Sequence, residues 1–276
     1  MSLLEIINLI SVGLAEYNFK LHVASDIGID QLFLPPENIR SQENLNKIED
    51  WTATNKMKLN KEKTKIMVFN YTYNYQFSTR LYIEEVLIEI ISETKLLGVI
   101  IRSDLSWHSN TKMLIKKAYS RMTILRKLYS FKIPVKDLVT IYITYIRCLL
   151  EQSCVLWHSS LTEENRNTLE RVQKVSLRII MGDEYSCYED ALKLANLETL
   201  EERRTFLCLE FAKSCIKSPS TCSMFPQNDS QRQEQKRNCH SKYKEKYKVQ
   251  YARTDRLYKS AIPYMQRLLN SEANSK

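Results

Sequence analysis

The amino-acid sequence predicts an α+β fold, with a small antiparallel sheet and one helix first, a mainly helical bundle next and a basic tail last. Between residues 65 and 101 short β-rich runs alternate with polar turns. From residue 110 onward apolar residues recur at three- and four-residue steps, which is the helical period. The 276 residues include only 4 glycines, fewer than the turns of a doubly wound nucleotide-binding sheet normally need, so helix should dominate.

The first part of the chain predicts one helix packed on the small sheet. This helix begins at Ser41, a good N-cap residue, and one of its faces is apolar. Residues 65–69 and 95–101 are expected to be buried strands, and residues 79–91 are typical of strand, turn and strand. The apolar face of the helix is formed by Leu45, Ile48, Trp51 and, less regularly, Met57.

Five helices are predicted between residues 110 and 217, where they form an all-helical bundle. Pro134 separates the first helix from the second, because proline cannot continue a helix. Thr162, followed by two glutamates, begins the third helix, and Gly182 closes it. The expected helices are 113–128, 134–157, 162–182, 185–197 and 200–216, and the expected domains are 1–40, 41–108, 109–217 and 218–276.

Positive charge increases towards the C-terminus of the chain, whose formal net charge is +9. Residues 1–110 hold 11 Lys and Arg against 14 Asp and Glu, residues 111–217 hold 18 against 13, and residues 218–276 hold 12 against 5. That gradient favours a polyanionic partner for the later two-thirds of the chain. A solvated helical surface followed by a largely disordered basic tail, with one short helix near residues 261–269, explains it equally.

The seven cysteines contain no CxxC pair. Most lie in apolar helical patterns, as Cys148 and Cys208 do, where a reduced thiol packs as a small hydrophobe. An intracellular location is therefore expected, with cytoplasm and nucleus not distinguished. No apolar run reaches the ~18–20 residues of a membrane span, so no membrane partner is expected. Cys222, Cys239 and His240 are a weak candidate for a zinc knuckle, and we expect no metal there.

Residues 45–64, LNKIEDWTATNKMKLNKEKT, contain a specific helix-to-strand pattern. They match the form LxxIxxWxxxNxMxLNxxKT. A strand with the sequence Lys-Leu-Leu-Gly-Val follows at 95–99, and Asp-Leu-Ser-Trp follows at 104–107. In this order the motifs resemble the C-terminal part of the palm of reverse transcriptases from non-LTR retrotransposons.

The helical region extends this resemblance to the thumb of the same polymerases. In the family this region is a long helical domain with several short motifs in a fixed order. The matching segments here are Tyr-Ile-Thr-Tyr-Ile-Arg at 142–147, Trp157, Glu-Arg-Val-Gln-Lys at 170–174, Leu-Glu-Glu-Arg-Arg at 200–204 and Phe-Ala-Lys at 211–213.

The resemblance covers nearly all of residues 41–217 and implies a chemistry for which this chain lacks the residues. An RNA-directed DNA polymerase of this family holds two Mg²⁺ ions on carboxylates from one strand motif and from a following YxDD hairpin. Neither motif occurs in the sequence. Ser2 to Asn8 resembles the segment directly after YxDD, so the chain is expected to start just after its own active site. We expect it to be catalytically inactive alone and to bind no cofactor.

The resemblance implies roles for several residues, each of which also has a purely structural interpretation. Lys63 stands where these polymerases place a lysine that protonates the leaving pyrophosphate, but without metal ligands a solvated turn lysine is favoured. Leu97 and Gly98 resemble the primer grip, although a tight turn between strands needs the same glycine. Basic residues of the thumb helices would contact template–primer phosphates, although each is also an ordinary solvated residue. These residues are Arg121, Arg126, Lys127, Arg171, Lys174 and Arg178.

The absent half of the palm predicts unprotected apolar surface. Strands that lose their neighbours expose their apolar side chains, and we expect such a face near residues 66–69 and 97–101, with poor solubility. Large aromatic residues should be buried elsewhere. The expected core anchors are Trp51, Trp107 and Trp157.

Two functions of different classes follow from the sequence. The first is a reverse transcriptase fragment that binds an RNA–DNA or single-stranded backbone without sequence preference. The second is a helical protein-interaction module with no nucleic-acid role. Salt distinguishes them, because counterion release makes affinity fall with salt concentration only in the first case. The sequence does not indicate an oligomeric state.

Overall fold

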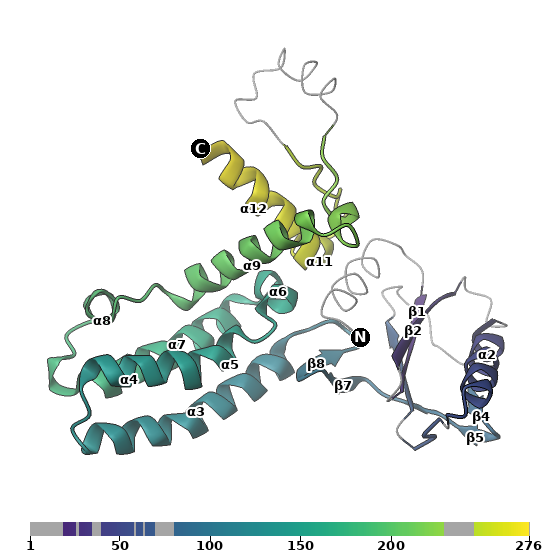
Figure 1. Ribbon diagram of the computed structural model, residues 1–276, viewed down its shortest axis with the longest axis horizontal. Coiled ribbons are helices and arrows are strands. Elements are labelled where there is room, and N and C mark those ends of the chain that lie inside the picture. Colours follow the sequence, from purple (N-terminus) through teal and green to yellow (C-terminus); the bar gives the residue numbers. More distant parts are fainter. Residues whose placement is uncertain are drawn as a thin grey trace, which may run out of the picture. The chain divides into compact units, whose positions relative to one another are not determined.

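Two units make up the structure, which is a computed structural model. The first unit, Met1–Ser106, contains short strands and one long helix in its described part, and the second, Trp107–Lys276, is mainly helical (Figure 1). The expected α+β class is therefore confirmed. The described residues are 19–25, 28–34, 40–57, 59–62, 64–69, 80–228 and 246–275.

Strand β3 (Lys65–Phe69) is an inner strand of a four-stranded sheet with the order β2-β1-β3-β6. β1 (Phe19–Ser25) and β2 (Gly28–Leu34) form an antiparallel hairpin, and β1 also pairs antiparallel with β3. β6 (Glu89–Ile90) pairs with β3 in parallel. The expected strand at 65–69 is confirmed, but the sheet is mixed rather than purely antiparallel.

Helix α2 (Arg40–Thr54) contacts β2 and β4 (Tyr82–Ile83) and confirms the helix expected in this region. The side-chain amide of Gln42 joins helix to strand. Its Nε2 donates to the Tyr82 carbonyl at 2.8 Å, and its Oε1 accepts from the Tyr82 backbone N–H at 2.9 Å. The buried core of this unit consists of Leu45, Leu59, Ile66, Leu81, Ile83 and Ile88.

Two short hairpins complete the first unit. β4 pairs with β5 (Val86–Leu87), which confirms strand, turn and strand within residues 79–91. β7 (Glu93–Leu96) pairs with β8 (Val99–Arg102), so the single strand expected at 95–101 is corrected to a hairpin. Its turn residues, Leu97 and Gly98, have φ values of 47° and 87°. Positive φ at both turn residues matches the twist of paired strands, which is why the chain reverses here.

The strand residues expected to form an exposed apolar face are mostly buried. Ile66 is fully buried in the core cluster that contains Leu45 of α2, and Met67 is 4% exposed. Val99 and Ile101 of β8 are also buried, and only Leu97, at the hairpin turn, is exposed. The prediction of an exposed face at 66–69 and 97–101 is therefore wrong, apart from the turn itself.

Two of the three tryptophans are core anchors, as predicted. Trp107 and Trp157 are buried, whereas Trp51 is 51% exposed. The buried face of α2 continues from Leu45 to Thr52, which is 3% exposed and lies one position beyond Trp51. A helix of this length turns only one stripe towards the sheet, so Trp51 points away from it.

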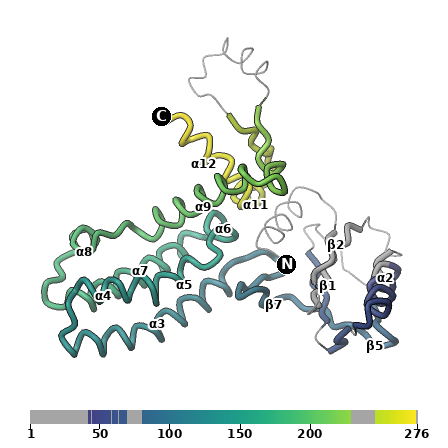
Figure 2. The backbone as a smooth tube through the Cα atoms, viewed as in Figure 1, coloured from purple at the N-terminus to yellow at the C-terminus, as the bar shows by residue number. Residues whose placement is uncertain are grey.

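In the second unit α3 (His108–Ser130) and α7 (Glu163–Met181) pack against each other in parallel (Figures 1 and 2). Near their starts, His108 Nδ1 lies 3.4 Å from Asn165 Oδ1. At their other ends Gly182 contacts Tyr129, because a Cβ at Gly182 would lie 1.8 Å from the tyrosine hydroxyl oxygen. The two helices are therefore aligned over their whole length.

The single helix expected at 134–157 is broken. α4 (Val135–Ile141) continues into a π-helical segment, Tyr142–Arg147, and into α5 (Cys148–Glu151). Ser153, in the left-handed region with φ 52°, then separates α5 from α6 (Cys154–Trp157). A serine in this conformation gives no signal in an otherwise helical pattern, so the break was not predictable from the spacing of apolar residues.

The ends of the other helices agree with local capping signals. The side chain of Thr162 accepts a hydrogen bond from the Asn165 N–H at the start of α7, and Gly182 follows its last residue. α8 (Tyr188–Ala195) is shorter than the range 185–197 expected for it. α9 (Leu200–Lys217) starts with a reciprocal capping box between Thr199 and Glu202.

The described part of the expected tail is folded against α9. α12 (Ala261–Ser275), preceded by α11 (Asp255–Tyr258), packs on α9. The amide of Asn270 bonds both the N–H and the carbonyl of Tyr247 at 2.9 Å, and Gln266 bonds the Met224 carbonyl and the Gln250 N–H. The short helix expected near 261–269 is therefore present, and it extends to Ser275. The prediction of a largely disordered tail is wrong for residues 246–275, which are folded.

We predict that Gly182→Ala destabilises the helical unit by about 2 kcal/mol or more, measured as the free energy of unfolding in urea. Gly182 has φ 52° and ψ −121°, a conformation that L side chains rarely adopt, and its added Cβ would collide with Tyr129. Adding Tyr129→Ala removes the collision but not the backbone strain, so the double variant should regain part of the loss. An unchanged midpoint in the single variant would contradict this account of the helix end.

Candidate nucleic-acid interface

Every side chain of helix α3 that is charged at pH 7 is positive. It contains six lysines and arginines and no aspartate or glutamate. Five of the six are exposed, and none of the five makes an ion pair with a described carboxylate. We call these five residues the α3 basic surface; they are Lys112, Lys116, Lys117, Arg126 and Lys127.

Sequence analysis identified only part of the α3 basic surface. Arg126 and Lys127 were predicted, whereas Lys112, Lys116 and Lys117 were missed. The signal for them was available, since Lys112 and Lys116 are spaced by four residues and therefore share one helix face. The absence of any carboxylate between residues 108 and 130 was the more informative pattern.

Arg171, Lys174 and Arg178 form a second exposed basic stripe, on α7. Steps of three and four residues place them on one helix face. The Lys174 ammonium lies 4.9 Å from the ring centroid of Tyr188, and the Arg178 guanidinium lies 5.1 Å from that of Tyr185. A cation–π contact orients each cation without neutralising its charge. The structure thus brings these three predicted residues together on one helix.

Arg121, the remaining predicted contact on α3, has a structural partner. Its guanidinium donates to the backbone carbonyl of Tyr145 and lies 4.3 Å from the Tyr145 ring centroid. Tyr145 belongs to the π-helical segment, whose wider turns disturb the regular hydrogen-bond ladder. Arg121 therefore joins α3 to this segment, and we leave it out of the α3 basic surface.

The other predicted site residues belong to the first unit. Leu97 is 57% exposed at the β7–β8 turn, and Gly98 follows it with positive φ. A primer grip and a tight turn both need an exposed turn with positive φ, so this geometry does not distinguish the two interpretations of Leu97 and Gly98. Lys63 lies outside the described residues.

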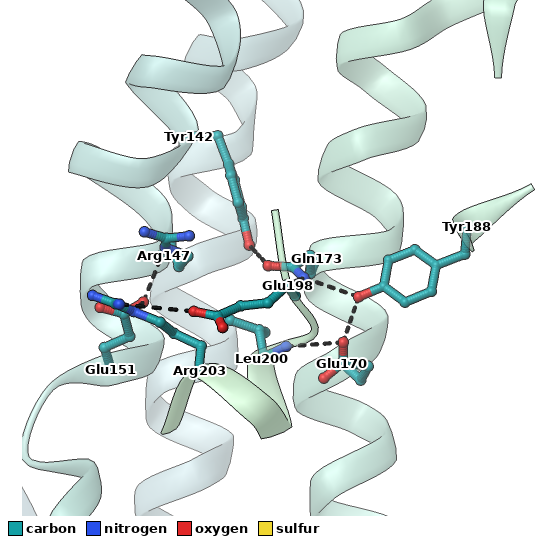
Figure 3. Close-up of polar contacts among 9 residues, drawn as sticks. All are labelled: Tyr142, Arg147, Glu151, Glu170, Gln173, Tyr188, Glu198, Leu200 and Arg203. Atoms are coloured by element: carbon teal, nitrogen blue, oxygen red, sulfur yellow. Dashed lines mark hydrogen bonds and ion pairs between the residues drawn. The ribbon is translucent and has the colours of Figure 1, made fainter. Parts of the chain in front are cut away.

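A buried polar network lies between α7 and its neighbours (Figure 3). Gln173 of α7 is fully buried at its centre. The hydroxyl of Tyr142 donates to Gln173 Oε1 at 2.6 Å, and Gln173 Nε2 donates to the Tyr188 hydroxyl and to the Glu198 carbonyl, both at 2.9 Å. The Tyr188 hydroxyl in turn donates to the carboxylate of Glu170. These bonds connect the π-helical segment, α7, α8 and the turn before α9.

The same network contains an ion-pair cluster around Glu151 (Figure 3). Its carboxylate oxygen lies 2.9 Å from Arg147 Nε and accepts from Arg203 Nε at 3.3 Å. Arg203 also lies within 3.7 Å of the carboxylate of Glu198. Arg147 and Arg203 are thus held by carboxylates, in contrast to the cations of the α3 basic surface.

Burial keeps the two network tyrosines protonated. Removal from water raises the pKa of Tyr142, and burial together with the hydrogen bond to Glu170 raises that of Tyr188. Both hydroxyls therefore remain hydrogen-bond donors at any ordinary pH. This arrangement suits a structural element and offers neither a general base nor a nucleophile.

A second buried cluster surrounds Arg204, which has no exposed surface. Its Nε donates to His158 Nδ1 at 3.3 Å, so the His158 proton is on Nε2, which donates to Thr205 Oγ1 at 3.1 Å. Burial, with the nearby cations Arg204 and Arg166, lowers the pKa of His158 to about 3. Neither Nη atom of Arg204 has a hydrogen-bond partner among the described residues.

No group of three or more His, Cys, Asp or Glu side chains among the described residues is placed to hold a metal ion, and Cys239 and His240 lie outside these residues. No single described helix is long and apolar enough to cross a membrane, and only the bent pair Val135–Glu151 and Cys154–Ser160, at 41°, reaches that length and composition together.

No protein-family model, curated protein or solved structure matches the chain. The family resemblance therefore rests on the sequence motifs alone. Within the helical unit, six motif residues lie in the network of Figure 3. They are Tyr142, Arg147, Glu170, Gln173, Leu200 and Arg203.

We predict that Gln173→Met lowers the free energy of unfolding by about 2–4 kcal/mol. Methionine fills a similar volume but leaves the hydroxyls of Tyr142 and Tyr188 and the Glu198 carbonyl without their buried partner. Urea unfolding followed by circular dichroism measures the loss. Asn167→Met, at an exposed position of the same helix, should change stability by less than about 0.5 kcal/mol. Equal midpoints for the two variants would show that the network adds no stability.

We predict that His158 makes the folded state less stable as the pH falls below about 6.5. The pKa of His158 is about 3 in the folded chain, below the ordinary value of 6.5. The unfolded chain therefore binds a proton in this window that the folded chain does not, and stability falls by up to about 1.4 kcal/mol per pH unit. Unfolding at pH 7 and pH 5, where carboxylates titrate little, measures the slope. His158→Gln should flatten it, and an unaltered slope would contradict the prediction.

Proposed function

We propose that this chain is a fragment of a retrotransposon reverse transcriptase, corresponding to the C-terminal palm and the thumb, and that its helical unit binds nucleic-acid backbone. The observation that carries the binding proposal is the α3 basic surface, with five exposed cations and no carboxylate on the same helix. As it stands, the chain has no metal-binding aspartate pair and is proposed to be inactive as a polymerase.

The character of the cations favours phosphate contacts over base contacts. They lie on regular helices, and four of the five on α3 are lysines, whose side chains are long and flexible. Flexible point charges follow a phosphate backbone but do not read base edges, which need fixed, bidentate geometry. The expected ligand is therefore an RNA–DNA hybrid or a single strand, bound independently of sequence.

The first unit is proposed to be the remaining part of the palm. The sequence motifs carry this assignment. The β7–β8 hairpin supports it, since its turn at Leu97 and Gly98 exposes backbone of the kind a primer grip needs. In the intact polymerase Mg²⁺ would be held by carboxylates that this sequence does not contain.

A protein-binding module is the second candidate function. Around the junction of α3 and α4 several large apolar side chains are exposed, among them Ile124 at 42%, Phe131 at 75% and Val135 at 39%. Apolar residues gathered near one turn are typical of protein contacts. These side chains are apolar and do not bind phosphate. Binding of a protein partner here would therefore not depend on the charges of the α3 basic surface.

We predict that Lys116→Gln, Lys117→Gln and Lys127→Gln together weaken binding to a fluorescently labelled RNA–DNA hybrid and reduce its dependence on salt. Each lost phosphate contact should lower the slope of log affinity against log salt by nearly one, so three lower it by about 2–3. Fluorescence anisotropy between 50 and 200 mM salt, roughly the range over which such contacts are lost, measures this slope.

The matched control removes the same charge elsewhere on the helical unit, with Lys193→Gln, Lys217→Gln and Lys259→Gln. Lys193 and Lys259 pair with neighbouring carboxylates at exposed positions, so their loss should cost little stability. Equal weakening by the two triple variants would show that only net charge matters and would remove the assignment to α3. Absence of any binding at low salt by the folded chain would overturn the nucleic-acid role and favour the protein-binding alternative.

A further inference from the structure

The turn between α3 and α4 lies at one end of the helical unit and has a defined backbone geometry (Figure 1). The N–H of Ile133 donates to the Leu128 carbonyl at 3.4 Å, and the N–H of Lys132 donates to the Tyr129 carbonyl at 2.9 Å. These two bonds form the Schellman motif that ends many helices. We call residues 129–136 the α3–α4 tip; all of them are exposed except Ile133, which is half-buried.

A lysine occupies the left-handed position of this turn. Lys132 has φ 57°, whereas most turns of this type have glycine there, because an L side chain is strained at positive φ. The Lys132 side chain is exposed and makes no ion pair with a described carboxylate. Strain of this kind persists where the side chain has a use other than stability. The turn therefore holds a cation at a place where stability alone favours glycine.

Apolar side chains and cations alternate along the tip. Phe131 is 75% exposed, and Tyr129 and Val135 are 41% and 39% exposed. Four cations precede, separate and follow these side chains, and Asp137 is the one carboxylate between residues 126 and 137. The four cations are Arg126, Lys127, Lys132 and Lys136. The tip thus presents an aromatic ring surrounded by positive charge.

We propose that the α3–α4 tip docks on the surface of an anionic lipid membrane, with Phe131 inserted below the headgroups and the surrounding cations on lipid phosphates. Neither the proposed nucleic-acid binding nor the family resemblance enters this inference. At a bilayer surface apolar side chains enter the acyl boundary while neighbouring cations meet anionic headgroups. Such docking requires no membrane-spanning helix, so the search for long apolar runs in the sequence did not indicate it.

The chemistry of the tip favours a lipid surface over a pocket in a protein partner. Three of its four cations are lysines, and lysine is depleted at the centres of protein interfaces, where its charge would lose water. At a bilayer the long lysine side chain instead follows apolar surface up to the headgroups. Asp183 and Glu184 follow Gly182, which contacts Tyr129, and reduce the positive charge at this end of the unit. Binding should therefore need the apolar residues as well as the cations.

The experiment measures co-sedimentation of the full-length chain with phosphatidylcholine vesicles that contain about one-third phosphatidylserine or none. Strong binding is expected only with phosphatidylserine. Phe131→Ala should weaken it about tenfold, because the ring no longer leaves water. Lys132→Gly should weaken it about fivefold through the loss of one cation. Glycine fits the left-handed position better than lysine, so Lys132→Gly should not lower Tm, and a folding defect would not explain its weaker binding.

Phe206→Ala is the matched control, because Phe206 is a 46% exposed phenylalanine on α9 of the same unit. It should leave vesicle binding unchanged. Phe131 is no part of the α3 basic surface, so Phe131→Ala should leave binding to the RNA–DNA hybrid unchanged, and the two proposals can fail separately. Membrane docking is overturned if the chain binds neither vesicle, if it binds both equally, or if Phe131→Ala and Phe206→Ala bind phosphatidylserine vesicles equally well.

Discussion

The buried amide of Gln173 is the constraint on which the arrangement of the helical unit depends. Helix α7 contacts α3, α4, α8 and α9, and Gln173 lies fully buried among them. A planar amide offers acceptors on one side and donors on the other, so it fixes where Tyr142, Tyr188 and the Glu198 carbonyl must stand. Apolar packing alone is not directional, and several registers of these helices would bury similar area. The hydrogen bonds select one of them.

This constraint changes what the family resemblance says about function. In the segment Glu170-Arg171-Val172-Gln173-Lys174, Val172 and Gln173 are buried and Glu170 bonds Tyr188, whereas Arg171 and Lys174 are exposed. One motif therefore combines residues that hold the helices together with residues that are free to meet a ligand. A polar motif residue is thus no indication of a binding site by itself. The nucleic-acid proposal therefore rests only on outward-facing cations, including the five of the α3 basic surface, none of which belongs to a motif.

Features with local causes were predictable from the sequence, and features with distant causes were not. The capping residue Thr162 and the closing Gly182 placed α7 to within one residue at each end, because a cap acts on adjacent backbone groups. The β7–β8 turn was predicted only as one of two interpretations of Leu97 and Gly98, because leucine seldom adopts the positive φ of Leu97. The folded tail was missed because Gln266 and Asn270 are ordinary polar residues until they meet backbone from the segments at 224 and 247. The cluster at Arg204 likewise forms only when α6 and α9 meet.

The charges of helix α3 favour the proposed polyanionic partner over the alternative protein partner. Its cations repel one another, and pairs four residues apart, such as Lys112 and Lys116, destabilise an isolated helix. No carboxylate on α3 offsets this repulsion. The helix is held instead by the packing of its buried face, with Leu114, Met122 and others, against α7. A repulsion that persists in the free protein is relieved when phosphates bind, so part of the binding free energy comes from the helix itself. An apolar partner at Phe131 would leave that repulsion unchanged.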